Sequence, residues 1–164
     1  MTLTIERLKE IYRYDPVSGL FFRVKKFRAR RPLDTPIGSL NKVTGYLSVM
    51  IDGHRYYLHR LAFLWMTGEI PSEVDHEDRN KTNNIWSNLR KATHSQNHGN
   101  RVAQRGSTSG FKGVTWDKAR NKWSAKIMVR GKIMNLGRFD APEEAHAVYA
   151  AVAKKHFGEF ARTA

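Results

Sequence analysis

The chain of 164 residues carries 29 Lys and Arg against 15 Asp and Glu, which gives a formal net charge of +14, and it contains no Cys. The absence of Cys excludes disulfide bonds and thiolate zinc sites, so any metal must be held by imidazole, carboxylate or amide groups. The charge favours nucleic acid as the partner, because a basic surface binds polyphosphate with release of counterions. A basic protein that is merely soluble or ribosome-associated is the alternative.

No segment has the pattern of a leader or a membrane span. Residues 1–10 lack a basic stretch followed by a long apolar run. The longest apolar stretch, residues 61–66, is far too short to cross a bilayer. We therefore expect a cytoplasmic protein that has no membrane partner.

Capping and turn residues mark the first elements of the chain. Apolar side chains recur at helical spacing over residues 5–12, after Thr4, a residue type that caps helix N-termini. Further on, the dipeptide Asp52-Gly53 lies between two strand-like runs and is the strongest short-range signal for a two-residue hairpin turn. An amphipathic helix then follows and ends near residue 68.

A basic run begins at residue 25, and the two prolines after it, Pro32 and Pro36, favour a loop. Two interpretations stay open for this run, a solvated turn and a contact with phosphate. The candidate DNA-contacting residues here are Lys25, Lys26, Arg28 and Arg30.

Residues 74–97 are unusually polar, with five Asn and two His in 24 residues, more than packing requires. Thr93 and Gln96 fit a capping box, which predicts a helix that begins at Thr93 and carries Asn97 in its first turns. A carboxylate beside a His, with an amide on a nearby helix, suits metal-assisted phosphodiester hydrolysis.

Local geometry leaves this nuclease interpretation open. Adjacent residues on a regular strand point to opposite faces of the sheet. Asp75 and His76 would therefore have to lie at an irregular strand end to serve one site. From these residues alone, a nuclease site and an Asn-rich structural loop are both possible.

Several motifs over residues 38–97 occur in the order found in HNH endonucleases, and the chain resembles this family, in particular its homing type from phages and introns. The motifs that carry the resemblance are Gly45-Tyr46 through Asp52-Gly53, His59-Arg60-Leu61-Ala62, Val74-Asp75-His76, Asn83-Asn84, Ser87-Asn88-Leu89-Arg90 and Ser95-Gln96-Asn97. The resemblance implies a ββα-metal fold, in the variant whose third signature residue is Asn.

The same resemblance implies roles for four residues. Asp75 and Asn97 would hold one divalent ion, Mg²⁺ or Mn²⁺. His76 would be the general base that activates water, and Asn88 would brace the loop and orient His76. The cation would stabilise negative charge on the scissile phosphate and the leaving 3′ oxygen.

Three further histidines leave alternatives open. His59 stands where the family usually has His, and it is either a structural hydrogen-bonding residue or a catalytic one. His94 and His98 flank Asn97 and are either exposed helix residues or contacts to phosphate or metal. Many HNH enzymes also hold a structural zinc with four Cys; this chain has none, so flanking hairpin and helices must support the motif.

Residues 98–110 are polar, rich in Gly and Ser, and without an acidic side chain, which predicts a basic linker. Its two arginines, Arg101 and Arg105, are candidate DNA contacts. Fully extended, the segment reaches roughly 40 Å, comparable to the ~34 Å of one DNA turn. Modules on either side could contact adjacent parts of one duplex.

The segment from residue 111 predicts three short strands followed by one helix, with the first strand over 111–116. Residues 123–130 alternate between apolar and mostly basic or polar side chains, the period of a half-buried strand. A helix-covered sheet with Lys and Arg on its open face suits the DNA major groove. An exposed sheet that only keeps the domain soluble is the alternative.

Residues 110–161 resemble the plant ethylene-response-factor (Apetala-type) DNA-binding domain. The matching segments are Lys112-Gly113-Val114, Lys122 to Ile127, Leu136-Gly137-Arg138-Phe139-Asp140 and Pro142-Glu143-Glu144-Ala145 to Ala151. The contacts implied by position are Lys112, Thr115, Trp116, Lys126, Met128, Arg130 and Asn135. Thr115, Met128 and Asn135 replace Arg or Trp contacts of the family, so we expect a different target or weaker base readout.

Together these features predict an α+β protein with an HNH module over 1–97, a linker over 98–110 and a DNA-binding domain over 111–164. The expected function is metal-dependent DNA cleavage or nicking of the homing type, by a monomer or weak homodimer acting on double-stranded DNA. The expected location is the cytoplasm of a bacterial or phage-infected cell. The alternative is a non-catalytic DNA-binding regulator with a decayed nuclease module.

Overall fold

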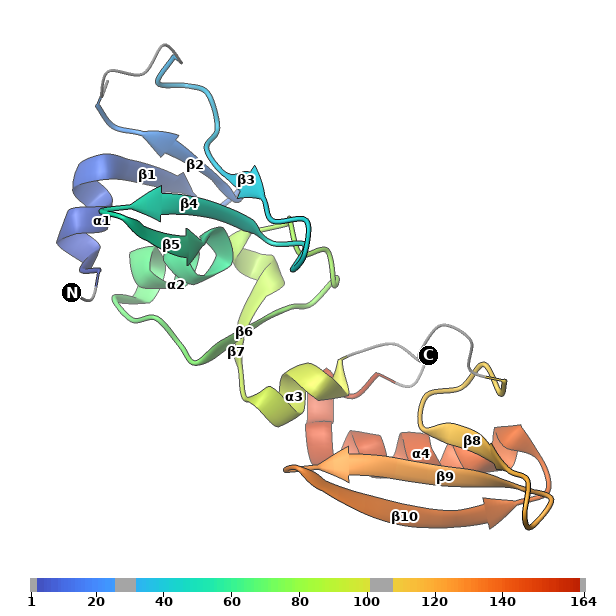
Figure 1. Cartoon of the computed structure of the whole chain (residues 1–164). Helices are drawn as coiled ribbons and strands as arrows, with labels where there is room; N and C mark the ends of the chain where they lie inside the picture. Colours follow the sequence, from blue (N-terminus) through green and yellow to red (C-terminus); the bar gives the residue numbers. More distant parts are fainter. Residues whose placement is uncertain (1–2, 26–31, 101–107, 163–164) are drawn as a thin grey trace. The chain divides into compact units, whose positions relative to one another are not determined.

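The computed structural model describes residues 3–25, 32–100 and 108–162, without the side chain of His98. The chain divides into two compact units, Met1–Ala92 and Thr93–Ala164. Each unit combines helices with antiparallel strands (Figure 1), which confirms the predicted α+β class. No helix among the described residues is long and apolar enough to cross a membrane.

The first unit opens with the predicted helix α1 (Ile5–Ile11), and Thr4 Oγ1 accepts a hydrogen bond of 3.2 Å from the backbone N of Arg7 at its start. Strands β1 (Tyr12–Asp15) and β2 (Leu20–Arg23) then form an antiparallel hairpin. Phe21 of β2 and Leu8 of α1 are completely buried, so helix and hairpin contribute to the same core.

A three-stranded sheet follows, in the order β3–β4–β5, from β3 (Ser39–Leu40), β4 (Leu47–Ile51) and β5 (His54–Tyr57). The β4–β5 turn is the predicted Asp52-Gly53 hairpin, with φ of 46° and 81°. Both values lie in the left-handed region that a type I′ turn requires.

Helix α2 (Leu58–Thr67) ends at Gly68, whose φ is 79°. Its Leu58 and Leu61 are almost completely buried in the core of the first unit. A two-stranded ribbon completes the unit, with β6 (Glu73–His76) antiparallel to β7 (Leu89–Ala92). The loop between these strands includes the 3₁₀ turn η1 (Trp86–Asn88).

The second unit begins with α3 (His94–Gly99) and continues into a sheet of order β10–β9–β8. The remaining elements are β8 (Val114–Asp117), β9 (Lys122–Val129), β10 (Lys132–Phe139), α4 (Pro142–Phe157) and η2 (Gly158–Phe160). Helix α4 lies along one face of this sheet (Figure 1). The prediction of three strands and one covering helix is therefore confirmed.

The first strand of this sheet starts at Val114, three residues later than predicted. Gly113 precedes it with a φ of 73°, and a Cβ added there would lie 2.3 Å from the Tyr149 ring of α4 and 2.6 Å from the Lys126 carbonyl oxygen. Only glycine fits this close approach. The turn at Gly113 delays the strand and brings α4 against the sheet, where Ala125 and Ala145 are fully buried.

Candidate active site

His76 is the last residue of β6 and is only 4% exposed. Its Nε2 lies 3.3 Å from Oδ1 of Asn84, a side chain that is 2% exposed. An amide oxygen accepts hydrogen bonds, so this contact favours the tautomer that carries the ring proton on Nε2. The lone pair is then on Nδ1, which is the nitrogen that can act as a base.

Burial lowers the pKa of His76 below its usual range, because the charged imidazolium loses hydration. The Asn84 hydrogen bond and the carboxylates of Asp78 and Asp75 oppose this shift, and the net direction is still downward. The ring is therefore neutral at pH 7, the state that a general base requires.

A cluster of rings surrounds His76. Tyr46 stacks on it with centroids 5.8 Å apart, and His59 meets it edge-on at 5.2 Å. Tyr57 in turn stacks on His59 at 5.6 Å. Burial, followed by the charges of His76 and Arg60, lowers the pKa of His59 to about 3. His59 is thus a neutral, buried ring that packs directly against the candidate base.

The loop that carries Asn84 rests on the turn between β1 and β2. The Tyr14 hydroxyl donates to the Asn84 carbonyl oxygen at 2.6 Å, and the Trp86 backbone N donates to the Pro16 carbonyl oxygen at 2.9 Å. At Gly19, with φ of 72°, an added Cβ would lie 2.5 Å from the Asn84 carbonyl carbon. The hairpin therefore provides the flanking support that the absence of Cys predicts.

Asn88 closes the same loop from its other end. Its Oδ1 accepts from the Asp78 backbone N at 3.0 Å, and its Nδ2 donates to Asp78 Oδ1 and to the Asn83 carbonyl oxygen, both at 2.9 Å. The Glu77 backbone N donates to the Asn88 carbonyl oxygen at 2.9 Å. These bonds connect the end of β6 to the start of β7, and they hold His76 at a defined strand end.

Asp75 precedes the candidate base and is 4% exposed. Its cross-strand neighbour is Arg90, whose Nε and Nη2 lie 2.9 and 2.8 Å from Asp75 Oδ2. This ion pair offsets the cost of burying the carboxylate. The described residues contain no group of three or more His, Cys, Asp or Glu that could hold a metal.

Asn97 lies on α3, in the second compact unit, whereas Asp75 and His76 lie in the first. The predicted capping box is confirmed, because the Gln96 N donates to Thr93 Oγ1 at 3.2 Å and the Thr93 N donates to Gln96 Oε1 at 2.8 Å.

Contacts within the second unit fix α3 against α4 and the end of β9. Gly99 lies against Phe157, where an added Cβ would be 2.8 Å from the ring, and the Arg130 N donates to Ser95 Oγ at 3.3 Å. Among the flanking histidines, His94 is exposed.

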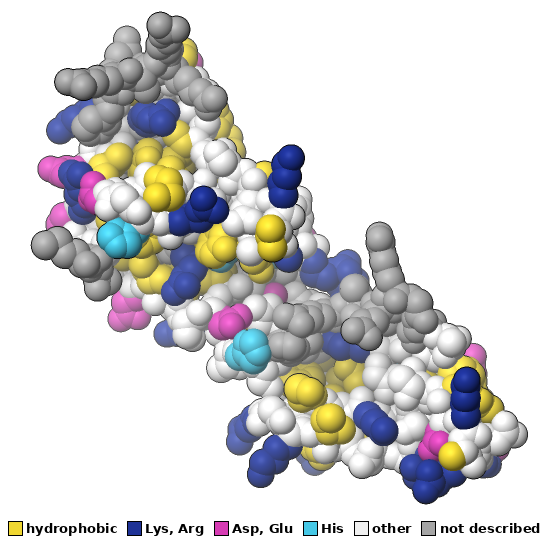
Figure 2. Space-filling view, viewed as in Figure 1, with side chains coloured by type: hydrophobic (Ala, Val, Ile, Leu, Met, Phe, Trp, Pro, Cys, Tyr) yellow, Lys and Arg dark blue, Asp and Glu magenta, His cyan; other side chains and the backbone are white. Residues whose placement is uncertain are grey.

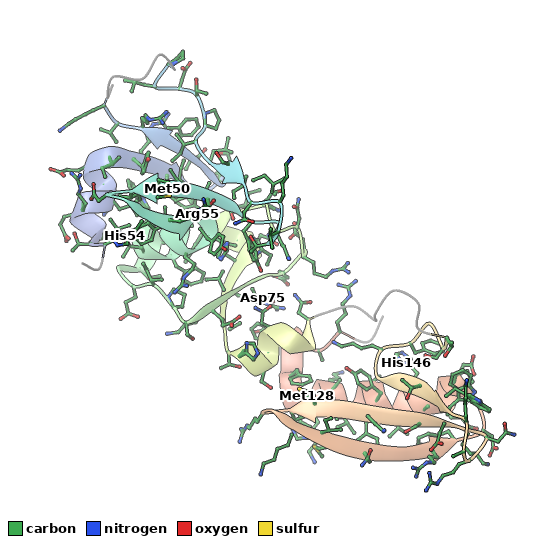
Figure 3. All side chains as sticks on the ribbon, viewed as in Figure 1. Met50, His54, Arg55, Asp75, Met128 and His146 are labelled. Atoms are coloured by element: carbon green, nitrogen blue, oxygen red, sulfur yellow. The ribbon has the colours of Figure 1, made fainter. Side chains whose placement is uncertain are left out.

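The candidate contacts of the C-terminal sheet differ in their surroundings. Lys126 and Asn135 are exposed cross-strand neighbours. Met128 is 52% exposed, and Figure 3 labels it near the end of β9. Thr115, Trp116 and Arg130 are exposed as well. Lys112 is half-buried and donates through Nζ to the Gly99 carbonyl oxygen.

In the first unit, Lys25 is exposed after β2. The other predicted contacts, Lys26, Arg28, Arg30, Arg101 and Arg105, lie outside the described residues.

Comparison with known proteins identifies the domain that contains the candidate site. A family model described as HNH endonuclease matches residues 56–99. The chain is 37% identical over 121 residues to a mimivirus protein (Acanthamoeba polyphaga mimivirus) named uncharacterized HNH endonuclease L560, covering 72% of this chain and 62% of that protein. It is 35% identical over 97 residues to Protein 3.8 of Escherichia phage T7, covering 58% of this chain and 79% of that protein. Residues 56–99 therefore form an HNH endonuclease domain, and the chain is homologous to an HNH endonuclease of mimivirus. No solved structure matches it.

The HNH match includes all four predicted signature residues, Asp75, His76, Asn88 and Asn97. It ends at residue 99, so the ethylene-response-factor resemblance stays a prediction. The chain spans 62% of the length of the mimivirus relative.

Sequence reasoning assigned no role to two residues that contact the HNH site, Asn84 and Arg90. Both stand inside recognised motifs, Asn83-Asn84 and Ser87-Asn88-Leu89-Arg90. The occurrence of Asn84 and Arg90 inside these two motifs is the sequence signal that could have identified them.

Proposed function

We propose that the protein is a divalent-metal-dependent endonuclease that hydrolyses phosphodiester bonds of double-stranded DNA at a target site, by nicking or cleavage of the homing type. The observation that carries this proposal is the state of His76, a neutral, buried imidazole held by Asn84 directly after the carboxylate of Asp75. Metal-assisted hydrolysis requires a general base and a hard-cation ligand close to the same scissile phosphate.

In this proposal Nδ1 of His76 takes a proton from the attacking water. The resulting imidazolium is stabilised in place, because its Nε2–H donates to Asn84 and because Asp75 and Asp78 supply nearby negative charge. Tyr46 and His59 hold the ring plane by packing. Asn88 keeps the loop closed so that the base stays at the end of β6.

Asp75 and Asn97 are the proposed ligands of one Mg²⁺ or Mn²⁺ ion. When bound, the cation supplies positive charge to the scissile phosphate and the leaving 3′ oxygen. Carboxylate and amide oxygens are hard ligands that fit these ions. Arg90 meanwhile fixes the orientation of the Asp75 carboxylate through their ion pair.

The C-terminal sheet is proposed to hold the target duplex. Its open side presents Lys126, Asn135 and Met128, and Arg130 follows at the strand end. A sheet of this kind can enter the major groove, where base edges carry sequence information. The basic side chains would contact phosphate and position the sheet. We propose a monomer or weak homodimer as the acting form.

The decisive experiment is divalent-dependent cleavage of supercoiled plasmid by the full chain and by His76→Ala. The variant should lose about 10²- to 10⁴-fold in rate, the usual contribution of a general base, and should keep its affinity for DNA in EDTA. His54→Ala, which removes an exposed imidazole from the same unit, is the matched control and should cut normally. Tight DNA binding with no cleavage by the wild-type protein would instead support a regulator with an inactive nuclease module.

A further inference from the structure

The first unit contains a second concave site, on the sheet β3–β4–β5. It is a cleft of about 320 Å³, and its lining includes none of the proposed catalytic residues. The polar and basic side chains that line it are Arg23, Ser39, Asn41, Ser48 and Arg55. Figure 3 shows Arg55 beside Met50, its cross-strand neighbour on β4.

Strand register explains why these side chains converge. Ser48 and Met50 alternate along β4 and therefore share one face of the sheet. Ser39 of β3 pairs with Ser48, and Arg55 of β5 pairs with Met50, so both partners join that face. Arg23 reaches the same cleft from the end of β2.

The charge of the cleft is unbalanced. Among the residues that the structure describes, two arginines line it and no acidic residue does. Elsewhere in the protein, guanidinium groups meet carboxylates at 2.8 Å, as Arg7 does with Asp52 and Arg90 with Asp75. Within residues 3–25, 32–100 and 108–162, neither Arg23 nor Arg55 forms an ion pair. Arg23 is nevertheless half-buried, which is costly for a charge that lacks a counterion.

The remaining surface of the cleft suits a nucleic acid backbone. Leu40 and Met50, which also line it, are 55% and 54% exposed. They offer apolar surface of the kind that deoxyribose can cover. Figure 2 shows hydrophobic and basic side chains next to one another on the visible face of the first unit. Asn41 Oδ1 accepts from the backbone N of Val43 and of Thr44, which leaves its NH₂ group as the donor toward a ligand.

We propose that this cleft binds a backbone phosphate of the DNA substrate, at a position separate from the scissile phosphate and from the C-terminal sheet. The inference rests on the proposed endonuclease function. Arginine forks bind phosphate oxygens with two parallel hydrogen bonds, and Ser and Asn are common partners of the same oxygens. An acidic peptide could form ion pairs with the two arginines. It has no deoxyribose rings, however, to pack against the exposed Leu40 and Met50.

The cleft has a functional consequence. It lies in the same compact unit as His76, so it anchors DNA to the nuclease unit without help from the C-terminal sheet. Phosphate contacts position a protein on DNA and carry no sequence information directly. The cleft would therefore contribute affinity to every sequence equally, while site choice depends on the second unit.

The test compares Arg23→Gln/Arg55→Gln with the wild type in duplex binding, followed by fluorescence anisotropy in EDTA over a range of salt concentrations. The slope of log affinity against log salt should become shallower by about 0.9 for each phosphate that the variant no longer neutralises. The matched control is Lys154→Gln/Lys155→Gln, which removes two exposed charges at the end of α4. The control should keep the wild-type slope, because it lowers the net charge equally without touching the cleft.

Three outcomes would overturn the inference. An unchanged slope in the arginine variant is the first, and an equal slope change in the control is the second. The third is displacement of DNA by polyglutamate as effectively as by inorganic polyphosphate of equal charge, which would assign the cleft to an acidic protein. If the double variant fails to fold, Ser39→Asp at an exposed position of the cleft should weaken binding by charge repulsion. A wild-type protein that neither binds nor cuts DNA would instead refute the proposed function itself.

Discussion

Asn84 Oδ1 and His76 Nε2 lie 3.3 Å apart, in a contact where both side chains are almost completely buried. The backbone of Asn84 is held in turn by the Tyr14 hydroxyl, 70 residues earlier in the chain. The tautomer of the candidate base therefore depends on packing between the N-terminal hairpin and the HNH loop. This relationship separates two roles, since Asn88 closes the loop and Asn84 orients the ring.

Replacing Asn84 by Leu removes the acceptor for Nε2–H while keeping the side chain about the same size. The Nδ1 and Nε2 tautomers of His76 then compete, and the imidazolium formed during the reaction loses a hydrogen-bond partner. We expect kcat to fall by about tenfold to hundredfold, less than the loss from removing the base itself, with little change in KM. Steady-state kinetics on a duplex substrate measures both values.

Asn84→Asp retains an acceptor oxygen at the same position and serves as the conservative control. It should recover a substantial part of the rate that Asn84→Leu loses. Equal activity of Asn84→Leu and the wild type would show that the tautomer is set elsewhere. Circular dichroism of each variant checks that the unit still folds.

The Arg90–Asp75 ion pair leads to a prediction about metal and stability. Arg90→Gln removes the guanidinium from an Asp75 carboxylate whose side chain is 5% exposed. Breaking a buried pair in this way costs about 3–5 kcal/mol. A divalent ion at Asp75 should restore part of that loss, because a ligand that binds only the folded state stabilises it.

Urea unfolding with EDTA and with millimolar Mg²⁺ measures this effect. The gain from Mg²⁺ should be larger in Arg90→Gln than in the wild type, since the guanidinium no longer competes for Asp75. Arg138→Gln is a matched control, because it breaks an exposed Arg–Asp pair in the second unit. Equal gains in all three proteins would contradict a metal ligand at Asp75.

Local signals in the sequence were sufficient to predict several elements and the chain segment that contains the candidate site. The Thr4 cap, the Asp52-Gly53 turn and the Thr93 capping box each depend on residues within a few positions, and all three are present. Asp75 and His76 are adjacent in the chain, so their motif is visible without a structure.

The contacts that build the candidate site are not local. The loop that places Asn84 beside His76 is contacted by Tyr14 and the β1–β2 turn, which belong to another element. Arg90 meets Asp75 through the β6–β7 register, which no short sequence window contains. Gly99 packs against Phe157, 58 positions later, and this contact fixes α3 in the second unit. Such contacts depend on tertiary packing, which periodicity and capping signals do not encode.

His59 makes the stability of the first unit depend on pH. Its folded pKa is lowered to about 3 from 6.5, so the unfolded chain binds the proton more readily. The stabilisation is complete above about pH 6.5 and is lost as the pH falls toward 3, by up to about 1.4 kcal/mol per pH unit. Burial lowers the pKa of His76 as well, which acts in the same direction.

Chemical denaturation at pH 7, 6, 5 and 4 tests this behaviour. His59→Phe should flatten the decline in unfolding free energy, because a neutral ring of similar shape has no proton to bind. His54→Phe, at an exposed position, is the control and should keep the wild-type decline. An identical pH dependence of His59→Phe and the wild type would place the acid sensitivity elsewhere.

The last prediction concerns Gly19, which supports the active loop from the β1–β2 turn. An added Cβ would lie 2.3 Å from the Ile85 backbone N and 2.5 Å from the Asn84 carbonyl carbon. Gly19→Ala should therefore displace the loop and lower kcat together with stability. Gly68→Ala is the matched control, because Gly68 has a similar φ of 79° and nothing within 4 Å. The Gly68→Ala variant carries only the backbone strain of about 1 kcal/mol, so it should cut DNA at the wild-type rate. Thermal unfolding and plasmid cleavage measure both effects, and equal activities of the two variants would show that the β1–β2 turn does not position the loop.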